Sequence, residues 1–121
     1  MIRLVDEPAR EWISARAVVD LAKVTDYLLS FDHPDGYTKA RFFARFGFDA
    51  GRPLVFVDAM VRHRADSELQ GFQETPYGVR YVVHGVLRSP DGRNPRIRSV
   101  WFQEQPGFVR LVTVYPLKEA R

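Results

Sequence analysis

Cysteine is absent from this 121-residue chain. The chain therefore has neither a disulfide framework nor a thiolate metal site, and it fits a reducing compartment. Apolar runs are short, and none approaches the roughly 20 residues that span a bilayer. The N-terminal segment MIRLVDEPAREW is too charged for a signal peptide. These features predict a cytoplasmic protein with no membrane partner.

Several catalytic motifs are also missing. The sequence has no Walker loop, no G-x-G-x-x-G, no H-E-x-x-H and no histidine pair at metal-ligand spacing. No serine lies in a nucleophile elbow, and we expect Asp32 and Asp35, which flank His33, to be loop and helix-cap residues. We therefore expect no cofactor. The chemistry left open is metal-free and uses histidine, lysine, arginine and hydroxyl groups.

Positive charge is in slight excess, with 18 Lys and Arg against 15 Asp and Glu and a net charge of +3. Its distribution is uneven, because residues 80–110 contain only two acids, Asp91 and Glu104. The same segment contains six arginines: Arg80, Arg88, Arg93, Arg96, Arg98 and Arg110. This balance is compatible with a polyanionic partner, although a similar excess is common in proteins that bind none.

The strongest strand signal runs from Tyr77 to Pro116, where three runs rich in valine and aromatic residues are separated by two turn clusters. This pattern predicts a three-stranded antiparallel meander. Helices are expected over 21–29, 37–46 and 53–64, a short strand at 69–72, an extended lead-in at 12–19, and an edge strand or mobile arm within 1–11. We therefore predict one α+β domain over 1–121, in which about three N-terminal helices pack on an antiparallel sheet of four to five strands.

The first and third of these helices have assigned faces. Asp20 is a suitable N-cap for the first helix. One face of it contains Leu21, Val24 and Leu28, and the inward face of the third contains Leu54, Val57 and Val61. His63 is expected on the outer surface of the third helix.

Lys39 occupies an unusual place on the second helix. At about 100° per residue it falls within the stripe formed by Phe42, Phe43 and Phe46. We favour snorkelling, in which the lysine stem covers the phenylalanines and the ammonium reaches the rim of the core. The alternative is a lysine aimed into a cleft between this helix and the sheet.

Alternation divides the side chains of the meander into two sets, neither of which is cleanly apolar. One set is Arg80, Val82, His84, Val86, Arg98, Val100, Phe102, Arg110, Val112 and Val114. The other is Tyr81, Val83, Leu87, Ile97, Ser99, Trp101, Leu111, Thr113 and Tyr115. One face can be a partly covered binding surface or an ordinary solvent-exposed sheet face. Trp101 is expected in the core, and His84 is expected to be a polar residue on a half-exposed strand.

A family resemblance covers the chain from Lys23 to Pro116. The sequence contains K-x-x-D-Y-L-L, H-P-x-G-x-x-K-A-x-F-F, Y-G-x-R-Y, a P-x-G-R turn, V-W and R-x-V-T-x-Y-P in this order. This succession resembles an uncharacterised bacterial domain family, which is similar to the barnase, EndoU, colicin and RelE-like superfamily of toxin ribonucleases. Three positions depart from the pattern, Ser89, Ser99 and Val114, and none removes a candidate functional group.

The resemblance implies a metal-independent endoribonuclease toxin that acts on RNA and is restrained by an acidic antitoxin or immunity protein. It implies a catalytic set of Lys39, His33, Thr113 and Arg98, with either His33 or Lys39 as base or acid. The residues expected to bind substrate are Arg80, Ser99 and Tyr115. The alternative is a non-catalytic basic module that docks a protein or nucleic acid.

One conflict affects this expected site. Strict alternation places the arginines on one sheet face and the hydroxyl groups of Ser99, Thr113 and Tyr115 on the other. Only one of these two groups can line a single cleft unless a β-bulge reverses a strand.

Overall fold

The computed structural model of the protein describes residues 7–118. In chain order its elements are α1 (Glu7–Ser14), β1 (Arg16–Val18), α2 (Leu21–Lys23), the π-helix η1 (Val24–Leu28), α3 (Tyr37–Ala44), α4 (Pro53–Asp66), β2 (Glu68–Thr75), β3 (Gly78–Val86), β4 (Arg96–Gln103) and β5 (Phe108–Pro116). The predicted α+β class is confirmed. No helix within the described range is long and apolar enough to cross a membrane.

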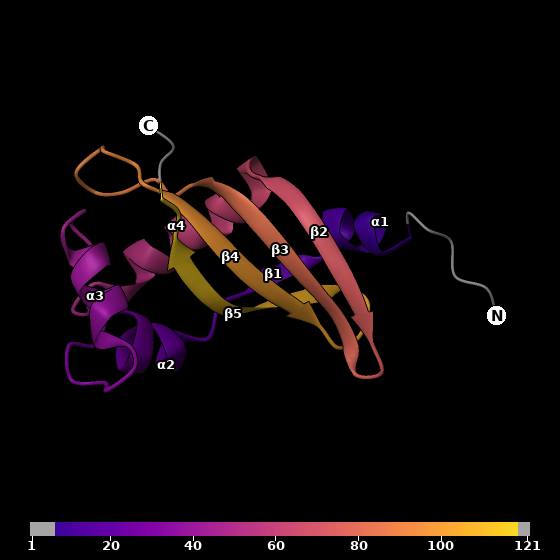
Figure 1. The fold of residues 1–121 in the computed structure, drawn as a ribbon, viewed down its shortest axis with the longest axis horizontal. Helices are drawn as coiled ribbons and strands as arrows, with labels where there is room; N and C mark the ends of the chain where they lie inside the picture. The colour runs from indigo at the N-terminus through magenta and orange to yellow at the C-terminus, as the bar shows by residue number, and fades with distance from the viewer. Residues whose placement is uncertain (1–6, 119–121) are drawn as a thin grey trace.

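The five strands form one sheet in the order β1-β5-β4-β3-β2 (Figure 1). The predicted meander is present as β3, β4 and β5, and β2 extends it on one side as a fourth antiparallel strand. β1 pairs in parallel with β5, so the sheet is mixed and the expectation of a purely antiparallel sheet is wrong at this edge. A parallel pair is possible here because the long α2-to-β4 segment separates the two strands in sequence.

The helices leave most of one sheet face uncovered (Figure 1). α4 packs behind β3, and α3 lies at the end of the sheet beside β5. The core between sheet and helices is centred on Trp101, Tyr81, Phe43 and Phe56, each of which is fully buried. The predicted core position of Trp101 is therefore confirmed.

The buried side of α4 differs from the predicted one. Phe56, Met60 and His63 face the core, whereas Leu54 is 69% exposed. α4 has apolar residues on two sides, and the larger side chains of Phe56 and Met60 fill the space beside the α3 phenylalanines. The expectation that His63 lies on the surface is wrong, because its side chain is only 2% exposed.

The N-terminal part is more helical than predicted. Residues 1–6 lie outside the described range, so an edge strand there is not addressed, but the chain is already helical from Glu7. Within the expected lead-in, only Arg16–Val18 is a strand. Trp12 is instead a helical residue of α1, and its ring packs on Tyr81 and Trp101.

The first predicted helix is confirmed in position but not in type. The Asp20 carboxylate accepts a hydrogen bond from the Ala22 backbone N–H at 3.0 Å, as expected of an N-cap. The helix then widens into η1, where the Leu29 N–H donates to the Val24 carbonyl. Val24 and Leu28 face the core as predicted, but Leu21 is about half exposed.

Candidate functional site

A β-bulge in β5 determines which side chains share the open face. Val100 of β4 lies opposite Thr113, and the next residue, Trp101, lies opposite Leu111. Val112 is therefore an extra residue that reverses the alternation of β5. Thr113 is now paired with Val100 on the open face, whereas the neighbouring Val114 is fully buried.

Because of this reversal, the hydroxyl groups of Thr113 and Tyr115 lie on the same sheet face as the arginines in the part of β5 that follows the bulge. Tyr115 lies directly opposite Arg98 on β4, and both side chains are exposed. Arg80 points to the same face from β3, where it pairs with Phe102. Thr113, Tyr115 and the two arginines therefore lie on one face, in an arrangement that strict alternation does not allow.

Lys39 reaches this face from α3. Its ammonium donates hydrogen bonds to Thr113 Oγ1 at 2.7 Å and to Tyr27 Oη at 3.3 Å. It also lies over the Tyr115 ring, 4.3 Å from the centroid, and over the Tyr27 ring at 5.3 Å. Lys39 is half-buried and connects α3 with η1 and β5 through these contacts.

Tyr27 is positioned by the π-helix and by a close approach of the chain. η1 ends one residue after Tyr27, and the backbone then returns so that Gly36 lies against the Tyr27 carbonyl. A Cβ at Gly36 would be 2.3 Å from that carbonyl oxygen, so only glycine fits. π-Helical turns often occur at functional sites, and this one directs the Tyr27 hydroxyl towards Lys39.

His33 supports Tyr27 from behind. Its Nδ1 accepts hydrogen bonds from the backbone N–H groups of Asp35 and Gly36, each at 3.0 Å. The imidazole ring meets the Tyr27 ring edge-on, with centroids 4.8 Å apart. These contacts require an unprotonated Nδ1, and they link His33 to Lys39 through Tyr27.

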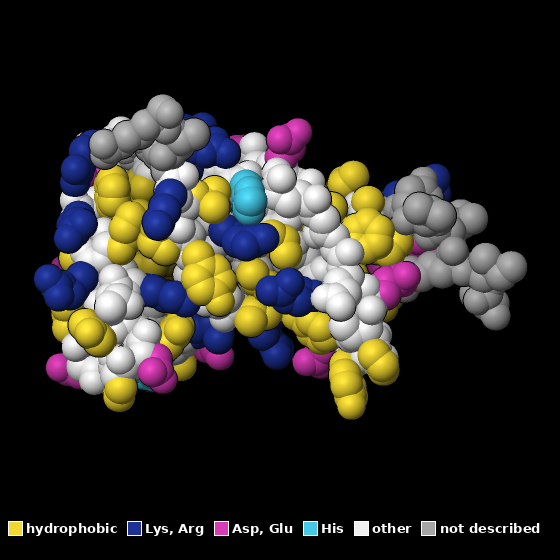
Figure 2. All heavy atoms as spheres, in the orientation of Figure 1, with side chains coloured by type: hydrophobic (Ala, Val, Ile, Leu, Met, Phe, Trp, Pro, Cys, Tyr) yellow, Lys and Arg dark blue, Asp and Glu magenta, His cyan; other side chains and the backbone are white. Residues whose placement is uncertain are grey.

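The open face beside Lys39 forms a hollow of about 540 Å³. Its lining includes Arg80, Arg98, Val100 and Tyr115. Figure 2 shows Lys and Arg side chains spread over this face among apolar ones, with Asp and Glu towards its margins. Two guanidinium groups and one ammonium beside a hollow are suited to binding an anion such as phosphate.

His84 extends the row on the other side of Arg98, its direct partner across β3 and β4. Burial, and then the positive charges of Arg98 and Arg96, hold the pKa of His84 below its usual value. Its Nε2 is shielded from solvent and has no hydrogen-bond partner within residues 7–118. His84 is therefore neutral near pH 7 and has a ring nitrogen that is not engaged.

Ser99 does not join this site, and its expected place on one face with Thr113 and Tyr115 is wrong. It is fully buried on the core side, where the Trp101 indole N–H donates to Ser99 Oγ at 2.8 Å. Ser99 Oγ in turn donates to His63 Nε2 at 2.7 Å, and His63 Nδ1 is 3.2 Å from the Val86 carbonyl oxygen. Burial lowers the pKa of His63 from 6.5 to about 4, and the Val86 hydrogen bond offsets part of that effect.

Sequence reasoning missed Tyr27, whereas His84 is a half-buried strand residue, as expected. A signal for Tyr27 was present, because the D-Y-L-L segment is part of the family pattern. For metal binding, the part of the chain that the structure describes contains no group of three or more His, Cys, Asp or Glu side chains.

Comparison with known proteins agrees with the fold. A chain of the contact-dependent growth inhibition toxin–immunity protein complex from Klebsiella pneumoniae 342 is similar to this protein, with a TM-score of 0.67 and 23% sequence identity. The similarity covers 83% of this chain and 99% of that chain. No curated protein matches the sequence significantly. Residues 13–118 match the model of a domain of unknown function, DUF6883, and the chain belongs to that family.

Proposed function

We propose that this domain is a metal-independent endoribonuclease toxin of a bacterial toxin–immunity or toxin–antitoxin system. The observation that carries the proposal is the bulge at Val112, which puts Thr113 and Tyr115 on the sheet face of Arg98. There the Lys39 ammonium donates to Thr113 and lies over the Tyr115 ring. Cations, hydroxyl groups and a neutral histidine on one face meet the requirements of RNA cleavage by the ribose 2′-hydroxyl.

The substrate phosphate is assigned to the hollow lined by Arg80, Arg98 and Tyr115. The Lys39 ammonium lies over the Tyr115 ring beside it. An ammonium group has three N–H donors, and Lys39 uses two of them on Thr113 and Tyr27. The third is free for a phosphoryl oxygen. Arg98 and Arg80 present planar guanidinium groups to the same hollow and can bind phosphate oxygens in pairs.

Cleavage forms a bond between the 2′-oxygen and phosphorus and breaks the bond from phosphorus to the 5′-oxygen. The proton of the 2′-hydroxyl passes to Nδ1 of His84, because Nε2 is shielded from solvent, and the leaving 5′-oxygen takes a proton from the Lys39 ammonium. His84 and Lys39 suit these roles because they flank Arg98 at the two ends of one row across β3, β4 and β5. The products are a 2′,3′-cyclic phosphate and a 5′-hydroxyl.

His33 is assigned a positioning role instead of a direct acid–base role. A proton on Nδ1 would break its hydrogen bonds with the Asp35 and Gly36 N–H groups, which hold the start of α3. Its ring also fixes Tyr27, which in turn holds Lys39. His33 therefore acts on the reaction through Tyr27.

The similarity to a chain of a growth-inhibition toxin–immunity protein complex supports a toxin–immunity setting. That complex contains a toxin and an immunity protein, and fold alone suits either partner. The clustered cations and the Lys39 contacts favour the toxin side, because charge on that face attracts RNA and would also attract an acidic inhibitor.

A basic docking module is the competing function. It also uses the exposed arginines for a polyanionic or acidic partner, but it does not need Lys39 held by Thr113 and Tyr27. Loss of the Lys39 ammonium therefore separates the two functions.

The test is to incubate the purified protein with total RNA in the presence of a chelator and, in parallel, to express it in bacteria. We expect RNA cleavage and growth arrest with the parent, and neither with Lys39→Ala. The matched control is Arg62→Ala, which removes an exposed cation that pairs with Asp58 on α4, behind the sheet. Intact RNA with the parent, together with equal growth of parent and Lys39→Ala, would exclude the toxin.

A further inference from the structure

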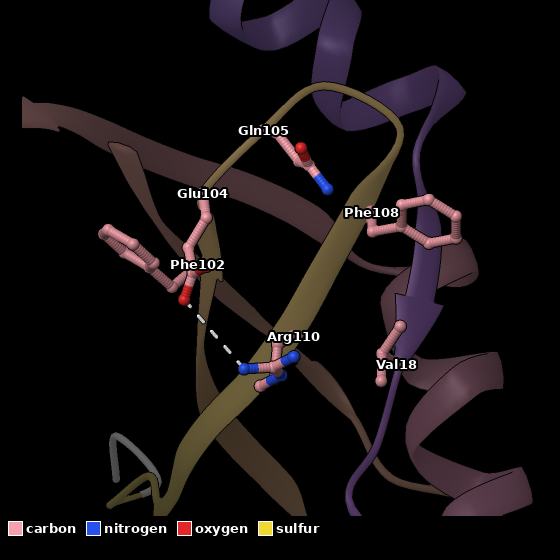
Figure 3. Close-up of a pocket in the computed structure, with 6 residues that line it drawn as sticks. All are labelled: Val18, Phe102, Glu104, Gln105, Phe108 and Arg110. Carbon is pink, nitrogen blue, oxygen red and sulfur yellow. Dashed lines mark ion pairs between the residues drawn. The ribbon is translucent and has the colours of Figure 1, made fainter. Parts of the chain in front are cut away.

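A second hollow opens at the far end of the same sheet face. It has a volume of about 270 Å³ and lies over β5 between β4 and β1 (Figure 3). Phe102, Arg110 and Val18 form one row across these three strands, because Arg110 pairs with both of the others. Figure 3 shows Phe102 and Phe108 on the two sides of β5, with Arg110 and Gln105 between them.

Phe108 is exposed, whereas aromatic side chains such as Trp101 and Tyr81 are fully buried on the opposite face of the sheet. Its side chain is 51% exposed, whereas the next residue, Val109, is fully buried. A half-exposed phenylalanine beside an exposed arginine is suited to stacking on a flat ring. Arg110 has one acid partner here, Glu104, at 4.0 Å. Both groups are more than half exposed, so this pair is weak and can open for a ligand.

The outward side chains of β4 connect this hollow with the Lys39 site. Arg98 and Val100 line the hollow beside Lys39, and Phe102 lines the second hollow. At the other end of the strand, Arg96 lines a third hollow, of about 510 Å³, that also contains His84, Glu68 and the ion pair between Arg88 and Asp66. Three hollows therefore follow one strand, and the distance from Arg96 to Phe102 is roughly 20 Å at the usual rise per residue.

Two outward arginines of β4, followed by the half-buried Phe102 and the exposed Phe108, match the chemistry of an unpaired nucleic-acid strand. Guanidinium groups follow the phosphates, and aromatic side chains stack bases without regard to sequence. Bases in a duplex are already stacked on each other and cannot lie flat on Phe108. Glu104 and Gln105 line the same hollow, and their side chains can form hydrogen bonds with the edge of a base.

We propose that the hollow formed by Phe102, Phe108 and Arg110 is a distal nucleotide subsite, and that the substrate is unpaired RNA running along β4 from the Lys39 site to this subsite. This inference rests on the proposed ribonuclease function and adds the class of substrate and its path. Binding at the distal subsite then requires an RNA several nucleotides long.

The experiment measures binding of RNA that cannot be cleaved. Single-stranded 2′-O-methyl oligonucleotides of mixed sequence, from two to about ten nucleotides, are titrated with the parent, Phe108→Ala and Arg110→Gln by fluorescence anisotropy. The control is Leu54→Ala, which shortens an exposed apolar side chain on α4, behind the sheet. A duplex of the longest oligonucleotide is measured beside them, and thermal melting checks that each variant is folded.

We expect Phe108→Ala to weaken binding of the longest single strand by about 5- to 100-fold and to leave the dinucleotide unchanged, since the loss of a stacked base has an effect of this size. Arg110→Gln should lower the slope of log affinity against log salt by about 0.7 for the long strand. The duplex should bind more weakly than the single strand.

The inference is overturned if folded Phe108→Ala and Arg110→Gln bind every oligonucleotide within twofold of the parent, as they would if this surface served a protein contact. Because the probe has no free 2′-hydroxyl, its binding does not depend on the reaction. A parent that cleaves RNA while Phe108→Ala binds normally refutes the distal subsite alone. A parent that shows the expected length dependence but never cleaves RNA refutes the proposed function alone.

Discussion

Acidification should destabilise the fold through His63. This histidine is buried and its pKa is lowered from 6.5 to about 4, chiefly by burial, so between these values the unfolded chain binds a proton that the folded chain does not. The contribution of His63 to the free energy of unfolding is therefore fully present above pH 6.5 and is lost as the pH drops towards 4. The loss reaches about 2 kcal/mol at pH 5 and about 3 kcal/mol at pH 4, from about 1.4 kcal/mol per pKa unit.

Urea denaturation at pH 7.5, 6 and 5 measures this effect, and His63→Gln is the companion variant. Glutamine keeps a donor and an acceptor near Val86 and Ser99 but does not titrate. It should be less stable than the parent at pH 7.5 and should lose little more at pH 5. His84, whose pKa is also lowered, adds a change of the same sign, so His84→Gln is measured beside it.

Asp91, a carboxylate whose pKa is lowered, does not contribute to the change in stability between pH 7.5 and 5. Hydrogen bonds from the Arg93 backbone and from neighbouring side chains hold the pKa of Asp91 at about 2, so it titrates well below this range. A parent that loses less than about 0.5 kcal/mol between pH 7.5 and 5, or a His63→Gln variant that loses as much as the parent, would refute the assignment.

Substitutions at three further positions test the site. Thr113→Val keeps the branched shape of the side chain but removes the acceptor for the Lys39 ammonium. We expect kcat/KM for RNA to fall about 10- to 100-fold with little change in melting temperature. An unchanged kcat/KM would contradict the role of this contact. His33→Asn places an oxygen where Nδ1 accepts the Asp35 and Gly36 N–H groups. It should keep most of the activity, whereas His33→Ala should lose about 1 kcal/mol of stability as well as activity; a folded but inactive His33→Asn would return His33 to a direct acid–base role. Ser99→Ala removes the partner of both Trp101 and His63, so it should cost about 1–3 kcal/mol in unfolding free energy and leave kcat/KM unchanged; a selective loss of kcat/KM would place Ser99 at the substrate after all.

Local patterns were sufficient for much of the fold. The turn clusters of the meander, the Asp20 cap and the glycine after the second helix each depend on neighbouring residues, and the structure has strands and helices where they predict them. Lys39 was identified as a candidate for the same reason, because its position among the phenylalanines depends on the periodicity of a single helix.

Features that depend on distant partners could not be predicted in this way. The bulge at Val112 is defined by the register of β5 against β4, and nothing within LVTVY marks which valine is the extra one. His63 is buried because Ser99 and Val86, 36 and 23 residues later, provide its hydrogen bonds. Two apolar sides on α4 made the choice of its inward face ambiguous, and the size of Phe56 and Met60 decided it.

In the proposed reaction, Lys39 and the residues around it cleave RNA through the ribose 2′-hydroxyl. The most direct measurement is the chemistry of the fragment ends after total RNA has been incubated with the protein and a chelator. We expect new fragments with 5′-hydroxyl and 2′,3′-cyclic phosphate ends for the parent and for Arg62→Ala, and none for Lys39→Ala. Fragments with 5′-phosphate ends, or equal cleavage by Lys39→Ala, would contradict it.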